Sequence, residues 1–188
     1  QVSYYDKEGE AVRKAFLKAP FHFDPRVTSR FSHSRYHPIL KTRRPHLGVD
    51  YGAPTGTPVL ASASGTVSFR GRDGGFGLMV KIRHPNGYVT SYAHLSRIEV
   101  KRGQKVGQGD QIGRVGATGL ATGPHLDYRV QDTSGRFINP QNVLALPSDK
   151  PVQEEYVGLF ASVRDQYLQR LNAIPEMTPF LNRVSPAD

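Results

Sequence analysis

The sequence predicts a mainly β fold, in which an antiparallel sheet fills the middle of the chain and a helix follows at the C-terminal end. Between residues 28 and 146, apolar residues alternate with other residues in several short stretches, the period of half-buried strands. Glycine and tight-turn residues separate these stretches, and no long helical period interrupts them, which favours antiparallel pairing. After residue 150 the apolar spacing changes to three and four residues, as in an amphipathic helix.

The strands are expected in a simple order along the chain. They cover residues 59–69, 78–82, 88–95, 112–115 and 126–130. Gly65 lies inside the first of them and indicates a bend or bulge. The Pro85-Asn86-Gly87 sequence is a strong tight-turn signal, so we expect it to join the second and third strands as a hairpin.

The chain divides into three zones. Residues 1–27 read as the stub of a preceding β domain with a linker, residues 28–147 as the β domain, and residues 148–188 as a C-terminal helical extension. The helix is expected to pack against the β domain or a neighbouring domain. Its apolar positions are Val157, Phe160, Val163, Tyr167, Leu168 and Leu171.

Composition excludes several classes of protein. The 188 residues contain no cysteine, so disulfides, thiolate nucleophiles and cysteine zinc sites are absent. The formal charge of +9 favours anionic partners, but the basic residues are scattered without a nucleic-acid-binding motif, so we expect no nucleic acid partner. No apolar run approaches the ~20 residues of a membrane span. Because the chain starts at Gln1 without an apolar leader, we expect a mature or trimmed form whose membrane attachment, if any, lies upstream.

Four short segments carry candidate chemistry. His46 and Asp50 share a face and combine an imidazole with a carboxylate, a common part of a zinc ligand set. His94 ends an expected strand and shares its face with Tyr92. In the strand after Pro124, alternation places His125, Asp127 and Arg129 on one face, outward towards solvent or a cleft. His37 could line the same region. Taken alone, each segment is weak evidence for a site and is better explained by an ordinary structural role, such as a strand-end histidine, a surface hydrogen bond or a polar loop.

Taken together, the segments resemble the lysostaphin-like, or LytM-type, zinc endopeptidases over roughly residues 28–146. The matching motifs are an H-x-x-x-D followed by a Gly-Ala-Pro entry (His46–Pro54), a Y-x-H-L strand end (Tyr92–Leu95), a glycine-spaced stretch (Gly103–Gly113) and a T-G-P-H-L strand (Thr122–Leu126). The flanks look like those of multidomain Gram-negative members. The resemblance therefore implies a periplasmic or cell-envelope enzyme with an open groove, which hydrolyses peptide cross-links of peptidoglycan.

The resemblance also implies roles for the site residues. His46 and Asp50 match two metal ligands, and His125 with His94 would assist the attacking water and stabilise the tetrahedral intermediate. One divalent metal is expected, zinc first and manganese or iron as alternatives. The family's third ligand is the second histidine of H-x-H, and here that position holds Asp127.

This departure leaves two interpretations open. Asp127 can still be a ligand, since carboxylates bind zinc, although a second carboxylate lowers the charge of the site and favours harder metals. Alternatively the metal site is broken, and the domain binds peptidoglycan or activates another cell-wall hydrolase such as an amidase. Retention of His94 and His125 beside a ligand-type residue favours the enzyme.

Overall fold

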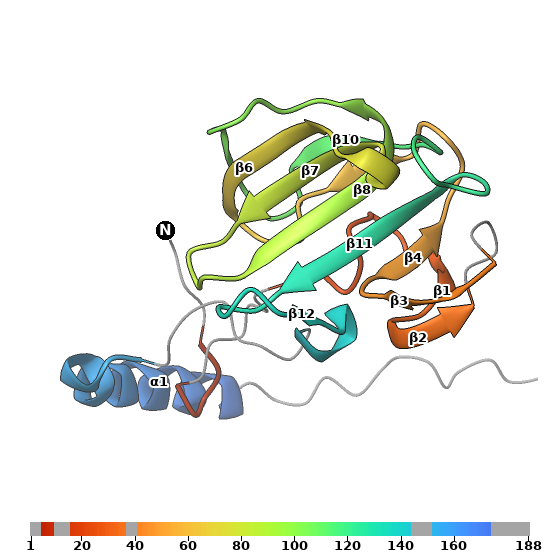
Figure 1. Ribbon diagram of the computed structural model, residues 1–188. Helices are drawn as coiled ribbons and strands as arrows, with labels where there is room; N and C mark the ends of the chain where they lie inside the picture. The colour runs from red at the N-terminus through yellow and green to blue at the C-terminus, as the bar shows by residue number, and fades with distance from the viewer. Residues whose placement is uncertain (1–4, 10–15, 37–40, 144–151, 174–188) are drawn as a thin grey trace, which may run out of the picture. The chain divides into compact units, whose positions relative to one another are not determined.

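The computed structural model describes residues 5–9, 16–36, 41–143 and 152–173. The chain forms two compact units, one from Lys14–Ser148 and the other from Gln1–Arg13 together with Asp149–Asp188. The larger unit carries all the strands described below (Figure 1).

The larger unit is built around one antiparallel sheet. Its path runs β1-β4-β11-β8-β7-β6-β9; β10 joins β5 and β8, β12 joins β11, and β2 and β3 form a separate two-stranded ribbon. The strands are β1 (Arg26–Ser29), β2 (Ser32–Tyr36), β3 (Arg43–His46), β4 (Val49–Gly52), β5 (Pro58–Leu60), β6 (Gly65–Arg72), β7 (Leu78–Arg83), β8 (Val89–Ile98), β9 (Lys105–Val106), β10 (Gln111–Val115), β11 (His125–Gln131) and β12 (Phe137–Ile138). Short 3-10 turns are η1 (Gly74–Phe76) and η2 (Pro140–Val143). Figure 1 shows β11 between β4 and β8.

The expected strand order is confirmed, with one correction. Residues 59–69 form two strands rather than one, because the chain leaves the ladder after Leu60. The backbone of Ala61 instead bonds to the loop before β10, donating to Asp110 O and accepting from Gly109 N at 2.8 and 2.9 Å. The hairpin turn is as expected, with Gly87 at φ +85°, a conformation that glycine adopts without strain.

The core lies on the face of the sheet opposite the candidate residues. Leu126, Tyr128 and Val130 of β11 are all buried, as their alternation predicted. The hydroxyl groups of Tyr92 and Tyr128 are buried too, and both hydrogen-bond the Ser62 hydroxyl, at 2.8 and 2.9 Å. Buried polar groups need such partners, so this cluster fixes β8 and β11 relative to one another.

The domain begins earlier than the sequence indicated. Residues 14–27 were expected to belong to a stub before the domain, but Phe16 and Phe21 are 2% and 6% exposed within the hydrophobic core of the larger unit. The Leu60 backbone N–H also donates to the Pro20 carbonyl at 2.9 Å. This segment therefore completes the core, a tertiary role that its linker-like composition does not reveal.

The smaller unit contains the C-terminal helix. A 3-10 turn, η3 (Glu154–Tyr156), leads into α1 (Val157–Asn172), so the helix starts later than residue 150. The ring of Phe160 packs edge-on against Tyr5, and the Arg164 guanidinium donates to the Lys7 carbonyl. Within the described residues of α1, none is buried. No helix in the described part of the chain is long and apolar enough to cross a membrane.

Candidate metal centre

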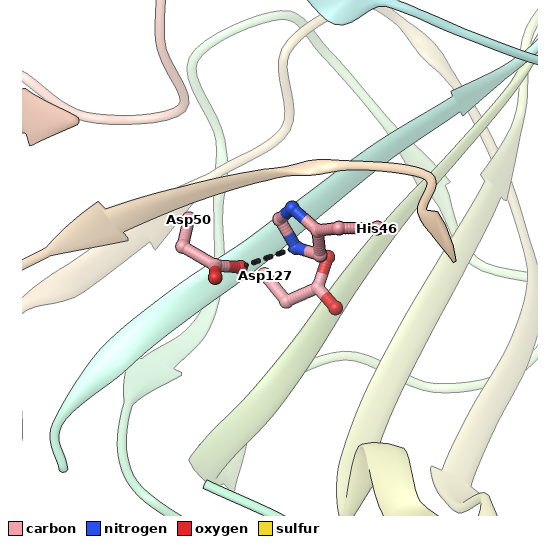
Figure 2. A group of neighbouring side chains, drawn as sticks. All are labelled: His46, Asp50 and Asp127. Carbon is pink, nitrogen blue, oxygen red and sulfur yellow. Dashed lines mark hydrogen bonds and ion pairs between the residues drawn. The ribbon is translucent and has the colours of Figure 1, made fainter. Parts of the chain in front are cut away.

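Three residues that the sequence singled out as metal ligands converge on one point. His46 ends β3, Asp50 lies in β4, and Asp127 lies in β11 directly opposite Asp50 in the antiparallel register. Each offers one ligand atom, and these atoms lie within 4.8 Å of one another. All three residues are buried, and Figure 2 shows their side chains turned towards each other.

The geometry of His46 fits a bound cation. Its Nδ1 lies 3.0 Å from the Arg30 carbonyl oxygen, which can only accept, so Nδ1 carries the proton. The Nε2 atom lies 2.9 Å from Asp50 Oδ1 (dashed line in Figure 2). In a neutral imidazole with this tautomer, two acceptors would face each other. A proton or a metal ion must therefore lie between them, and this donor set suits a divalent metal.

Asp127 lies in a more constrained environment than the sequence indicated. Its side chain is 4% exposed and is held by the Arg129 guanidinium in a bidentate pair, with Nε 2.9 Å from Oδ1 and Nη2 2.7 Å from Oδ2. The backbone of Gly48 lies close beside Asp127. A Cβ at position 48 would be only 2.6 Å from Asp127 Oδ1. The absence of a side chain at position 48 is therefore a requirement of this site.

His94 reaches the site through a β-bulge. Strand pairing places Leu78 opposite Leu95 but Val80 opposite Tyr92, so β8 has one extra residue at this point. His94 itself has φ +62°, which is uncommon for a non-glycine residue. The expectation that His94 shares a face with Tyr92 is therefore wrong. Tyr92 points into the core, and the bulge turns His94 to the opposite side, where it lines the pocket.

His94 and His125 stand next to each other, with ring centroids 4.7 Å apart. Their Nδ1 atoms donate to the carbonyls of Thr118 and Gly123, both at 2.8 Å, which leaves Nε2 of each ring available. The Nε2 atom of His125 is 3.9 Å from Asp50 Oδ1. Burial lowers the pKa of His94, although the Thr118 carbonyl and the negative charge of Asp127 act in the opposite direction.

Positive groups surround the Asp50 carboxylate. Burial alone would raise its pKa, but the hydrogen bond and charge of His46, with smaller contributions from His125 and Arg35, lower the pKa overall. The Arg35 guanidinium contributes from β2, where Nη2 lies 3.5 Å from Asp50 Oδ2. Asp50 is thus kept in the ionised form that binds a metal.

The predicted residues share one pocket with a volume of about 290 Å³. It contains His46, Asp50, His94, His125 and Asp127, together with Arg35, Arg44, Pro45, Gly75, Phe76, Leu120, Thr122 and Arg129. The sequence did not identify the arginines as part of the site. Alternation placed Arg129 on the face of Asp127, but nothing in the sequence indicated that the two side chains pair. His37 lies outside the described residues.

Comparisons with known proteins agree with this geometry. Residues 44–140, just over half of the chain, match the model of peptidase family M23. The chain is 44% identical over 175 residues to the DD-carboxypeptidase/endopeptidase Mpg of Neisseria meningitidis, covering 90% of this chain and 39% of the relative. It is 39% identical to the peptidoglycan DD-endopeptidase ShyC of Vibrio cholerae, covering 93% and 40% respectively. The chain thus spans about two fifths of the length of these relatives.

Solved structures place the fold in the same group. A zinc-containing peptidase from Vibrio cholerae superposes with a TM-score of 0.63 at 35% identity, covering 74% of this chain and 43% of that one. The catalytic domain of lysostaphin from Staphylococcus simulans gives a TM-score of 0.57 at 28% identity, covering 64% and 92%. The resemblance drawn from the motifs is therefore confirmed, and the chain belongs to peptidase family M23, the lysostaphin-type metallopeptidases.

Proposed function

We propose that this chain is a metal-dependent endopeptidase that cuts peptide cross-links of peptidoglycan in the periplasm or cell envelope. The observation that carries the proposal is the convergence of His46, Asp50 and Asp127 within 4.8 Å beside two further histidines. The printed names of the relatives, which include a peptidoglycan DD-endopeptidase, support this substrate.

The three converging residues would hold one divalent ion. Such an ion polarises a scissile carbonyl and acidifies water at neutral pH. The Nε2 atom of His46 would serve as its ligand atom, because the Nδ1–H group donates to the Arg30 carbonyl and holds the ring in place. Arg129 holds the Asp127 carboxylate in its orientation through the bidentate pair.

His94 and His125 would handle protons and charge. Their Nδ1 atoms are committed to backbone carbonyls, so Nε2 of either ring can take a proton from water and later return it to the leaving amine. When protonated, the same nitrogen donates to the oxyanion of the tetrahedral intermediate. The bulge at His94 fixes its ring in the pocket before substrate arrives.

Zinc is the ion that we propose, with manganese or iron as alternatives. Two carboxylates and one imidazole form a harder ligand set than two histidines and one carboxylate. The charges of a divalent ion and of its two carboxylate ligands together would sum to zero. The adjacent Arg129 guanidinium adds one positive charge at hydrogen-bond distance from Asp127, which offsets the second carboxylate.

One observation favours a second candidate, a catalytically inactive module that binds peptidoglycan or activates another cell-wall hydrolase. Both oxygens of Asp127 already accept hydrogen bonds from Arg129, which competes with metal binding. Charge-assisted bidentate pairs are strong and specific in geometry. In this alternative the Asp127–Arg129 pair replaces the third metal bond.

Digestion of purified peptidoglycan tests the two candidates. The chain is incubated with zinc or manganese, with and without a chelator, and released muropeptides are identified by mass spectrometry. We expect chelator-sensitive cleavage that His46→Gln abolishes. His84→Gln is the matched control, because His84 is equally buried but lies outside the pocket. Folded protein that cleaves with neither metal would instead support the inactive module.

Two further proposals concern the surroundings of the domain. We propose that the segment around α1 is a helical extension of the peptidase domain. We also propose that other cell-wall hydrolases are partners of this chain. Co-purification from envelope fractions, with and without residues 149–188, would test both.

A further inference from the structure

Two arginines face each other across the small β2–β3 ribbon. In the antiparallel register Arg35 lies directly opposite Arg44, so both side chains project from the same face of the ribbon. Like charges in this arrangement destabilise a sheet. Both residues line the pocket that contains the proposed metal ligands. The pairing therefore places two positive charges in the lining of this pocket.

The two guanidinium groups differ in their present partners. Arg35 donates to the Ser29 hydroxyl at 2.5 Å and lies 3.5 Å from Asp50 Oδ2, so it is fixed beside the metal site. Arg44 is exposed, and within the described part of the chain no hydrogen bond or ion pair engages its guanidinium. One arginine is held in place and the other is free to bind an anion.

Of these two arginines, Arg35 has a carboxylate partner in the pocket, Asp50, and Arg44 has none among the described residues. Asp50 and Asp127 are the carboxylates of the pocket, and both belong to the proposed metal site, where Asp127 is paired with Arg129. Arg44 therefore presents positive charge to the pocket without a matching carboxylate among the described lining residues. Guanidinium groups bind planar carboxylates through two parallel hydrogen bonds.

We propose that Arg35 and Arg44 form a subsite for a free carboxylate of the substrate peptide, carried by a residue next to the scissile bond. The inference rests on the proposed peptidase function and adds the chemical class of substrate that the pocket selects. The position of Arg35 sets how far the bound carboxylate lies from the proposed metal site, because the Arg35 guanidinium is within 4 Å of the proposed ligand Asp50. A carboxylate bound there is adjacent to the peptide bond at the metal.

A pair of synthetic cross-linked peptides tests the subsite. They share one sequence and differ only in whether the carboxyl groups flanking the scissile bond are free or converted to carboxamides. For the zinc-loaded wild type we expect kcat/KM about tenfold higher for the free acid, which corresponds to about 1.4 kcal/mol. Arg44→Gln should bring this ratio close to one. High salt should reduce the wild-type ratio, since exposed charges are screened.

Arg43→Gln is the matched control. Arg43 precedes Arg44 in β3 and is also exposed, but alternation directs its side chain to the other face and it does not line the pocket. The Arg43→Gln substitution removes the same charge from the protein as Arg44→Gln, so a general electrostatic effect would appear in both variants. We expect Arg43→Gln to keep the wild-type ratio.

The outcomes separate the subsite from the peptidase function. Equal cleavage of both peptides by the wild type, or an unchanged ratio in Arg44→Gln, overturns the subsite and leaves the peptidase intact. If neither peptide is cleaved, the peptidase proposal fails, and calorimetric titration with the free-acid peptide then decides the subsite. Binding that weakens about tenfold in Arg44→Gln but not in Arg43→Gln supports the subsite. Equal binding by the wild type and Arg44→Gln, or no binding at all, overturns the subsite.

Discussion

Replacing Asp127 by histidine would match the motif of the family, yet we expect this change alone to destabilise the protein. The Asp127 side chain is 4% exposed and that of Arg129 is 14% exposed, and three contacts of 2.7–3.1 Å join them. Removing one partner of a buried ion pair costs about 3–5 kcal/mol. Arg129 keeps some exposure and lies over the Phe76 ring at 4.5 Å, so we expect about 2–3 kcal/mol.

The assay is thermal and denaturant unfolding of the metal-free protein. For a chain of this size, the expected loss corresponds to a fall in Tm of about 4–12 °C. The double variant Asp127→His with Arg129→Gln removes the unpaired guanidinium and should recover most of the lost stability. A double-mutant cycle with Arg129→Gln then gives the coupling energy of the pair.

A control comes from a more exposed ion pair of the same unit. Lys81 and Asp73 are 3.2 Å apart, with side chains 35% and 41% exposed, so Asp73→Asn should cost less than about 1 kcal/mol. If Asp127→His leaves the free energy of unfolding within about 0.5 kcal/mol of the wild type, the Asp127–Arg129 pair does not stabilise the protein as expected. If the loss persists in the double variant, its cause is the size of histidine beside Gly48 and not the unpaired Arg129.

Three further predictions follow from the same geometry. Gly48→Ala puts a Cβ 2.6 Å from Asp127 Oδ1 and 2.8 Å from the Tyr128 carbonyl, so it should lower stability by about 1–3 kcal/mol and weaken zinc binding measured by calorimetry. Unchanged zinc affinity would contradict the role of Gly48. Zinc at about 100 times its Kd should stabilise the protein by about 2.7 kcal/mol, which is measured as a higher Tm. Asp50→Asn should abolish this increase. A wild-type Tm that does not change when zinc is added would count against the metal site. Burial lowers the pKa of His84 below its ordinary value of 6.5, despite the hydrogen bond to the Ser64 carbonyl. The unfolded chain therefore takes up the proton first, and stability should fall as the pH drops below about 6.5. His84→Gln should flatten that slope in unfolding titrations between pH 7.5 and 5.5, and an identical slope would show that His84 is not its source.

Most of the sheet could be predicted because its signals are local. Alternation in β7 and β11 reflects a strand with one buried face, and the Pro85-Asn86-Gly87 turn needs little more than its own residues. The split between β5 and β6 could not be predicted, because residues near Asp110 compete for the backbone of Ala61. Likewise, Phe16 joins the core through contacts with strands distant in the sequence.

The site likewise combines features that the sequence predicted with features that it did not. The H-x-x-x-D spacing and the position of Asp127 in an alternating strand identified three residues that the structure brings within 4.8 Å. Their roles as ligands stay a prediction until metal binding is measured. The bulge at His94 was missed, since regular alternation puts His94 on the face of Tyr92, and one extra residue in β8 reverses that assignment.

The fold class, the family and the residue types that carry the chemistry could be inferred from the sequence alone, because they depend on local periodicity and on motif spacing along the chain. The surroundings of those residues could be known only from the three-dimensional structure. The pairing of Asp127 with Arg129 and the approach of Arg35 to Asp50 arise from side chains of buried or partly buried strands. Charge interactions act through space and depend on burial, so their partners emerge only once the strands are placed next to one another.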